Sequence, residues 1–283
     1  WVCLSNQSTT IPATSLQLPI VQIVQAESPT TTPTGTPNTE PQVQHTQTAP
    51  PVVITPAIIA PETHPNYLYE ALLTPNDPNF GLQWSLSAIN TPRAWDITPG
   101  TNTPIIAVID TGFTLNHPDL AGAWLINSGE TGATTSQGPT PNCTSRGLAL
   151  DKSCNNLDDD GDGYKDNWRG WDFVNGDNDP SAGATSPSAP AAFHGPFVAG
   201  IGAARGNNGI GIAGVSWGAR IMPLQVLSDD GYGYTNDVAA AVRYAADHGA
   251  NVINLSLGSS NQDAFLRSAV DYAISRGVSV VAA

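Results

Sequence analysis

The sequence predicts an α/β protein in which a parallel β-sheet carries helices on both faces. Short apolar runs rich in β-branched residues alternate with amphipathic segments in the C-terminal part of the chain. The amphipathic segments end at glycines, which commonly terminate helices. Strands that alternate with helices in this way pair in parallel, and the connecting helices cover the sheet.

Four segments have the composition of buried strands. They span residues 104–109, 220–227, 251–256 and 278–282. Pro223 weakens the second, because proline cannot donate a hydrogen bond to a neighbouring strand. The fourth run stops without a turn, so we expect the sheet to be incomplete at its C-terminal end.

Two helices are expected between the last three strands. Thr235 or Asn236 can cap the first helix, and Gly249 can end it. The second helix can end at Gly277. Its apolar face holds Leu266, Val270 and Ala273.

Composition divides the chain near residue 64. Residues 1–64 are rich in Thr, Pro, Gln and Ser and contain three Glu but no Lys or Arg. Such a segment buries too little apolar surface to offset its ordering entropy, so we expect a disordered linker or stalk. Residues 75–283 have the pattern of a folded domain.

The charge balance excludes several classes of partner. Ten Lys and Arg against 24 Asp and Glu give a net charge of -14. Nucleic-acid binding needs clustered basic residues, so no nucleic-acid partner is expected. No apolar run reaches the roughly 20 residues of a membrane span. The acidic surplus suits calcium binding or simple solubility.

One short motif lies where parallel sheets bind their ligands. Asp110-Thr-Gly112 closes the first strand, at its carboxyl end. Alone, the triplet fits an ordinary turn. It also occurs in aspartic proteases, which need two such carboxylates, and this chain has only one Asp-Thr-Gly, so that interpretation requires a dimer.

Further motifs follow in order and resemble those of the subtilases, the subtilisin-like serine peptidases. The segments that carry this resemblance are residues 105–112, 117–120, 194–200, 214–227 and 251–258. Together they extend the resemblance over about residues 75–283. It implies a subtilisin-like fold and a serine endopeptidase that cleaves polypeptides. Residues 65–74 resemble the end of an inhibitory propeptide.

The resemblance assigns Asp110 and His194 as the aspartate and histidine of a catalytic triad. Histidine is the usual base for a serine hydroxyl, and a carboxylate on its far nitrogen fixes the tautomer. The family's nucleophilic serine and oxyanion asparagine would follow Ala283. A fragment that ends there is expected to be inactive, since loss of the serine in subtilisin costs on the order of 10⁶ in rate.

Departures from the family pattern leave alternatives open. Phe193, Pro196 and Phe197 replace residues that usually surround the histidine, and they could tilt His194 away from Asp110. The chain would then be a non-catalytic, calcium-stabilised pseudopeptidase or peptide-binding protein. Ser216 lies in a Gly-x-Ser-x-Gly pattern, but a nucleophile elbow needs a strand before it and a helix after it, and here a strand follows.

The resemblance also implies a cleft for an extended peptide, which would bind as an added strand. One wall corresponds to Gly231, Tyr232 and Gly233. The other corresponds to Ser256, Leu257 and Gly258.

An acidic segment has the spacing of a calcium loop. The aspartates at positions 1, 3, 5 and 9 are Asp158, Asp160, Asp162 and Asp166. Gly163 fits the turn at position 6, and Tyr164 offers a carbonyl at position 7. Position 12 is Arg169 rather than the glutamate of an EF-hand, so a loop-held calcium without flanking helices is expected, with a solvated acidic turn as the alternative.

A second calcium site is implied by the resemblance. Its ligands would be the side chains of Asp77, Asp119 and Asn208, with the carbonyls of Ile210 and Ile212.

The cysteines suggest an oxidising compartment. Cys143 and Cys154 are separated by ten residues and could form a disulfide. A bridge over so short a loop suits an extracellular or cell-surface protein. Zinc is not expected, because no Cys or His pair has ligand spacing. We expect a monomer.

Overall fold

The computed structural model describes residues 73–100, 104–135, 143, 147, 150–183 and 189–283. The predicted linker, residues 1–64, lies outside these ranges, as do all but the last two residues of the predicted propeptide end, 65–74. The boundaries drawn from composition therefore stay predictions.

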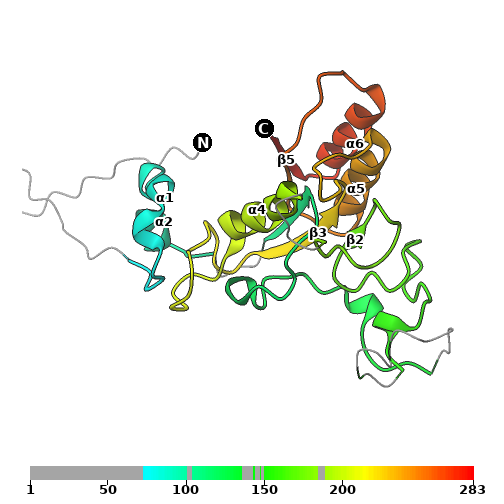
Figure 1. The fold of residues 1–283 in the computed structure, drawn as a ribbon, viewed down its shortest axis with the longest axis horizontal. Coiled ribbons are helices and arrows are strands. Elements are labelled where there is room, and N and C mark those ends of the chain that lie inside the picture. The colour runs from blue at the N-terminus through cyan, green and yellow to red at the C-terminus, as the bar shows by residue number, and fades with distance from the viewer. Residues whose placement is uncertain (1–72, 101–103, 136–142, 144–146, 148–149, 184–188) are drawn as a thin grey trace, which may run out of the picture. The chain divides into compact units, whose positions relative to one another are not determined.

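Five parallel strands form one sheet in the order β2-β3-β1-β4-β5, of which β2, β3 and β5 are labelled in Figure 1. The strands are β1 (Ile105–Asp110), β2 (Trp171–Asp172), β3 (Arg220–Gln225), β4 (Val252–Leu255) and β5 (Ser279–Ala282). Four of them match the predicted runs within a few residues. With only two residues, β2 is too short for a periodic pattern to reveal.

Strand β1 is central, between β3 and β4. Ala107 pairs with Met222 on one side and with Ile253 on the other. The last four residues of β1 are all buried, as the continuous apolar run predicts for a parallel strand covered on both faces. Pro223 is accepted within β3 opposite Val108, because β2 pairs only with the two residues after it.

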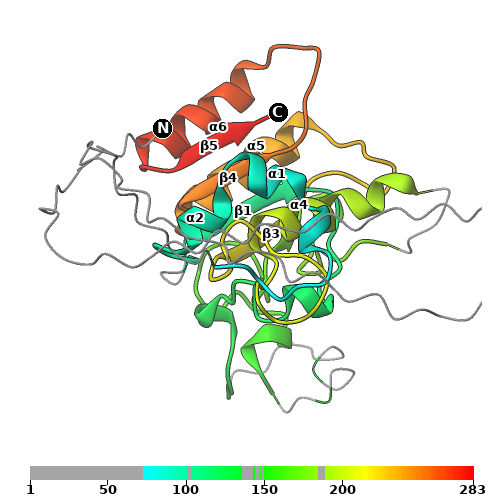
Figure 2. The same ribbon diagram turned by 90° about the vertical axis from the view of Figure 1, so that its left-hand side faces the viewer.

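Helices cover both faces of the sheet, which confirms the predicted fold class. Helix α4 (His194–Ala203) packs on one face, where Ala199 and Ala203 join a core with Val108. Helices α5 (Thr235–Asp247) and α6 (Ala264–Ser275) share the other core, which includes Ala107. Figure 2 shows β5, β4, β1 and β3 side by side in this order.

The expected cap of α5 is wrong. The N-cap residue is Tyr234, and no side chain caps the helix. The backbone carbonyl of Tyr234 instead accepts hydrogen bonds from the N–H groups of Asp237 and Val238. Helix α6 is capped by a side chain, since Asp263 accepts from the backbone of Phe265.

The remaining elements are short. They are α1 (Trp84–Ala88), α2 (Thr91–Trp95) and the 3-10 helices η1 (Phe80–Leu82), η2 (Pro118–Leu120), η3 (Ser128–Glu130), η4 (Lys152–Cys154) and η5 (Pro190–Phe193). Helix α2 is anchored by Trp95, whose ring lies 4.8 Å from that of Trp217. Among the described residues, no helix has the length and apolar character needed to cross a membrane.

Candidate active site

The carboxyl end of β1 meets the amino end of α4. Asp110 is the last residue of β1, and His194 is the first residue of α4. Their side chains meet with 2.7 Å between His194 Nδ1 and Asp110 Oδ1. The side chain of Asp110 is fully buried, whereas that of His194 is 47% exposed. Asp110 therefore fixes His194 at Nδ1, and about half of the histidine side chain stays accessible to solvent.

Backbone contacts fix this arrangement. Thr111 donates its N–H to Asp110 Oδ1 at 2.7 Å, and its hydroxyl accepts the N–H of Gly195 at 2.9 Å. A Cβ at Gly195 would lie 2.8 Å from the carbonyl oxygens of Thr111 and Gly112. The start of α4 thus approaches β1 so closely that only glycine fits after the histidine.

The residues beside His194 that differ from the family pattern do not displace its side chain. Phe193 is the N-cap residue of α4, and Pro196 lies in the first turn, where proline is accepted. The rings of Phe193 and Phe197 stack on each other with centroids 6.2 Å apart. The imidazole of His194 still reaches Asp110, so these replacements leave the pair intact.

The carboxylate of Asp110 has few hydrogen-bond donors. Its Oδ2 atom is buried and has no partner among the described residues. The negative charge is therefore stabilised through Oδ1, by the N–H of Thr111 and by the imidazole of His194. Such a carboxylate holds one tautomer of the histidine.

The two predicted peptide-binding segments flank the end of β1. One follows β3 and the other follows β4, the two neighbours of β1 in the sheet. In the first segment, Tyr232 is 79% exposed, and a turn at Gly231 is closed by hydrogen bonds to Ser228. In the second, Ser256 Oγ accepts from the amide of Asn254. The second segment continues through Leu257, which packs on the core, to Gly258.

Ser216 is not placed beside the histidine. Its N–H donates to the carbonyl of Gly202, eight residues along α4 from His194, which corresponds to about 12 Å of helix. The strand β3 follows it rather than a helix. This placement does not have the form of a nucleophile elbow.

The residues of the second predicted calcium site lie together. Asp119 accepts hydrogen bonds from the side chain of Asn208 and from the N–H of Ile212, both at 2.9 Å. Asp77 accepts from the N–H of Asn208 at 3.4 Å. Both carboxylates are buried. Ile210 belongs to the same turn, since its N–H donates to Asn208 Oδ1.

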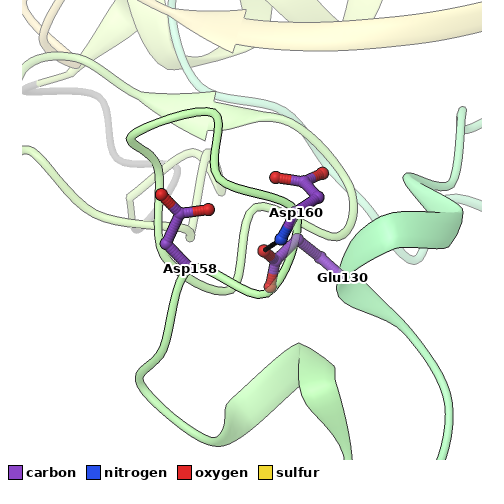
Figure 3. Close-up of side chains that lie close together, drawn as sticks. All are labelled: Glu130, Asp158 and Asp160. Carbon is purple, nitrogen blue, oxygen red and sulfur yellow. Dashed lines mark hydrogen bonds between the residues drawn. The ribbon is translucent and has the colours of Figure 1, made fainter.

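The acidic loop is only partly arranged as its spacing predicts. Asp158 and Asp160 group with Glu130, and their ligand atoms lie within 4.8 Å of one another (Figure 3). Asp162 and Asp166 lie outside this group. Asp166 accepts hydrogen bonds of 3.0 Å from the N–H of Asn156 at both carboxylate oxygens, and its place among the ligands stays a prediction.

Two other loop residues face the body of the protein. Asp162 Oδ2 lies 2.6 Å from Nε2 of His248, at the end of α5. The ring of Tyr164 packs edge-on against Tyr244 of α5. These contacts fasten the acidic loop to the helix.

Sequence reasoning missed Glu130. It lies 28 residues before Asp158, outside any recognisable metal-loop spacing. Glu130 is completely buried, and this burial raises the pKa of its carboxyl to about 7. The Asn-Ser-Gly-Glu turn gave no signal, because only the folded chain brings it beside the loop.

A disulfide joins Cys143 to Cys154, and both residues are buried. Cys154 ends η4, directly before the acidic loop. The bridge thus restrains the chain that enters the loop.

Comparison with known proteins agrees with the motifs. Residues 101–283 match the model of the subtilase family. The chain is 37% identical over 220 residues to the thermophilic serine proteinase of Bacillus sp. (strain AK1), covering 77% of this chain and 42% of that protein. It is 36% identical over 211 residues to thermitase of Thermoactinomyces vulgaris, covering 74% and 57%.

Among solved structures, fervidolysin from Fervidobacterium pennivorans, a keratinolytic enzyme related to subtilisin, aligns with a TM-score of 0.49 at 29% identity. The alignment covers 73% of this chain and 25% of that one. The chain thus spans only part of the relatives it matches. The family match alone extends over well more than half of the chain. The chain belongs to the subtilase family.

Proposed function

We propose that the protein of which this chain forms part is a serine endopeptidase that cleaves polypeptides by acyl transfer. The contact of 2.7 Å between Asp110 and His194 carries this proposal, together with the family membership. It disfavours a non-catalytic pseudopeptidase, since that alternative rests on a displaced histidine.

Each residue has a defined role in this mechanism. His194 Nε2 removes the proton of a serine hydroxyl as the serine attacks the peptide carbonyl, and the histidine later protonates the leaving amine. Asp110 holds the Nδ1 proton and stabilises the imidazolium. We propose that the serine, and an asparagine that donates to the oxyanion, follow Ala283 in the longer protein, and that residues 1–283 alone are inactive.

The substrate would bind at the carboxyl end of β1, beside Asp110 and His194. We propose that an extended peptide lies between residues 231–233 and 256–258, on either side of the end of β1. Backbone groups of both segments would pair with the substrate as neighbouring strands do. Gly233 supports this role, because a Cβ there would lie 2.0 Å from the carbonyl oxygen of Val226 and would displace the segment.

We propose that calcium stabilises the fold at Asp77, Asp119 and Asn208, with the carbonyls of Ile210 and Ile212. Asn208 donates its backbone N–H to the buried carboxylate of Asp77 and its side-chain amide to that of Asp119, and this oxygen-rich cluster suits calcium. A bound ion there would offset the charge of the two acids and brace the turn of residues 206–212.

We propose that the protein acts outside the cytoplasm, at the cell surface or in the medium, as a monomer. Xanthomonas campestris has a relative named "Extracellular protease", 34% identical over 235 residues. The disulfide between Cys143 and Cys154 is compatible with an oxidising compartment.

Hydrolysis of an unfolded protein by the full-length protein tests the proposed activity. The parent should produce peptides, and His194→Ala should lose at least about 10³-fold of the rate. Asp271→Asn, an exposed acid on α6, serves as a control with unchanged rate. Failure of the folded parent to cleave, or equal cleavage by His194→Ala, would contradict the proposal.

A further inference from the structure

A buried glutamate from outside the acidic loop faces two of the loop aspartates. Glu130 ends η3, and its Oε1 accepts hydrogen bonds from the N–H groups of Asp159 (2.6 Å) and Asp160 (3.2 Å). Its Oε2 is buried with no partner among the described residues. Figure 3 shows the carboxyl groups of Glu130, Asp158 and Asp160 around one small region.

Among the described residues, no basic side chain forms an ion pair with Glu130, Asp158 or Asp160. The nearby ammonium of Lys152 donates to the carbonyl of Gly129 at 3.3 Å. A fully buried carboxylate with a free oxygen is costly, and protonation of Glu130 would leave a buried O–H without an acceptor.

Backbone N–H groups of the loop stabilise the carboxylate of Asp158. Asp158 accepts hydrogen bonds from the N–H groups of Gly161, Asp162 and Gly163, which lower the pKa of its carboxyl. Asp160 Oδ2 accepts from the side chain of Asn127 at 2.9 Å. Asp158 Oδ1 accepts two of these bonds, whereas Asp158 Oδ2 and each oxygen of Asp160 accept one, so these three oxygens keep a lone pair that can ligate a metal.

We propose that Glu130, Asp158 and Asp160 bind a divalent cation, with calcium as the preferred ion. Carboxylate oxygens are the ligands that calcium favours. In a loop of this spacing, a glutamate at position 12 completes the site, and Arg169 occupies that position here. Glu130 supplies the missing carboxylate from a different part of the chain.

The site is connected to the helix beside the peptide-binding segment. Asp162 contacts His248, and the side-chain amide of Asn167 donates to Tyr244 Oη at 2.9 Å. The same Asn167 accepts from Asn127, which holds Asp160. The cation therefore stabilises the loop and, through it, the C-terminal end of α5.

Calcium titration by calorimetry on the chelator-treated full chain tests this site. The parent should bind calcium, and Glu130→Gln should lose one binding event or weaken it at least about tenfold. Asp271→Asn removes a carboxylate of α6 and should leave every event unchanged. Asp119→Asn should remove a different event, which separates the two calcium sites.

A second variant guards against misfolding of Glu130→Gln. Asp160 is exposed, so Asp160→Asn should preserve the fold and still weaken the same event. Calcium binding by both variants with the parent's stoichiometry and affinity would overturn the proposal, as would absence of this event in the parent. The titration needs no peptidase activity, so its result is independent of the proposed enzymatic function.

Discussion

Asp110 and His194, which are 84 positions apart in the sequence, meet at 2.7 Å across the junction of β1 and α4. The carboxylate is buried and the imidazole is half-exposed. A histidine that serves as general base for a serine needs this combination, because Nδ1 must be fixed while Nε2 must be accessible to the serine hydroxyl.

Replacement of Asp110 by asparagine should nearly abolish turnover in the full-length protein. An amide can donate to Nδ1 and so stabilises the wrong tautomer of His194, which costs about 10⁴-fold in kcat in a Ser-His-Asp triad. KM should change much less. Steady-state kinetics on a peptide substrate measure both, and a kcat within tenfold of the parent would rule out the assigned role of Asp110.

Thr111 should act as a positioning residue. Its hydroxyl accepts the N–H of Gly195, and its own N–H donates to Asp110. Thr111→Val replaces the hydroxyl with a methyl group and should lower kcat by about 10-fold or more with little change in KM, whereas Thr111→Ser, which keeps the hydroxyl, should retain the parent value. A similar kcat for the valine and serine variants would assign the hydroxyl no part in positioning.

Two glycines of α4 should respond oppositely to alanine. At Gly195 the new Cβ meets carbonyl oxygens at 2.8 Å, so Gly195→Ala should cost about 1–3 kcal/mol of unfolding free energy. At Gly202 the nearest atom is Ile106 Cδ1 at 3.8 Å, so Gly202→Ala should gain up to about 1 kcal/mol from helix propensity.

Urea unfolding of the two alanine variants provides this comparison. The two substitutions add the same methyl group to the same helix, so their difference reports the contact with β1. Equal stability of Gly195→Ala and Gly202→Ala would show that α4 does not approach β1 as closely as the structure describes.

Loss of the disulfide should destabilise the protein. The bridge closes a short loop, and replacement of both Cys143 and Cys154 by serine should cost about 2–3 kcal/mol in unfolding free energy. Cys3→Ser tests a cysteine outside the bridge and should have no effect. Unchanged stability of the double variant in thermal unfolding would contradict a structural role for the bridge.

The sheet was predictable because its strands carry a local signal. Continuous apolar runs such as residues 105–109 indicate strands buried on both faces, and the glycines after the amphipathic segments marked the helix ends. The two-residue strand β2 and the backbone cap at Tyr234 have no such signal. Tertiary contacts, rather than local pattern, produce both.

The part of the site that lies in recognisable sequence motifs was predictable. Asp110 and His194 were identified from residue types in order along the chain, and the structure adds the contact between them. Glu130 was not identifiable, because its partners lie almost 30 residues further on. Asp166 has the expected spacing but lies outside the group formed by Glu130, Asp158 and Asp160, because spacing does not determine which way a side chain turns in an irregular loop.

Labelling of the full-length protein with a fluorophosphonate, followed by mass mapping of the modified residue, tests the central claim most directly. Only a serine activated by a nearby base reacts rapidly with this reagent. We predict that one serine beyond Ala283 is labelled, that His194→Ala abolishes labelling, and that Asp271→Asn does not affect it. Labelling of His194→Ala at the parent rate, or no labelling of the folded parent, would contradict the assignment of Asp110 and His194 to a serine peptidase.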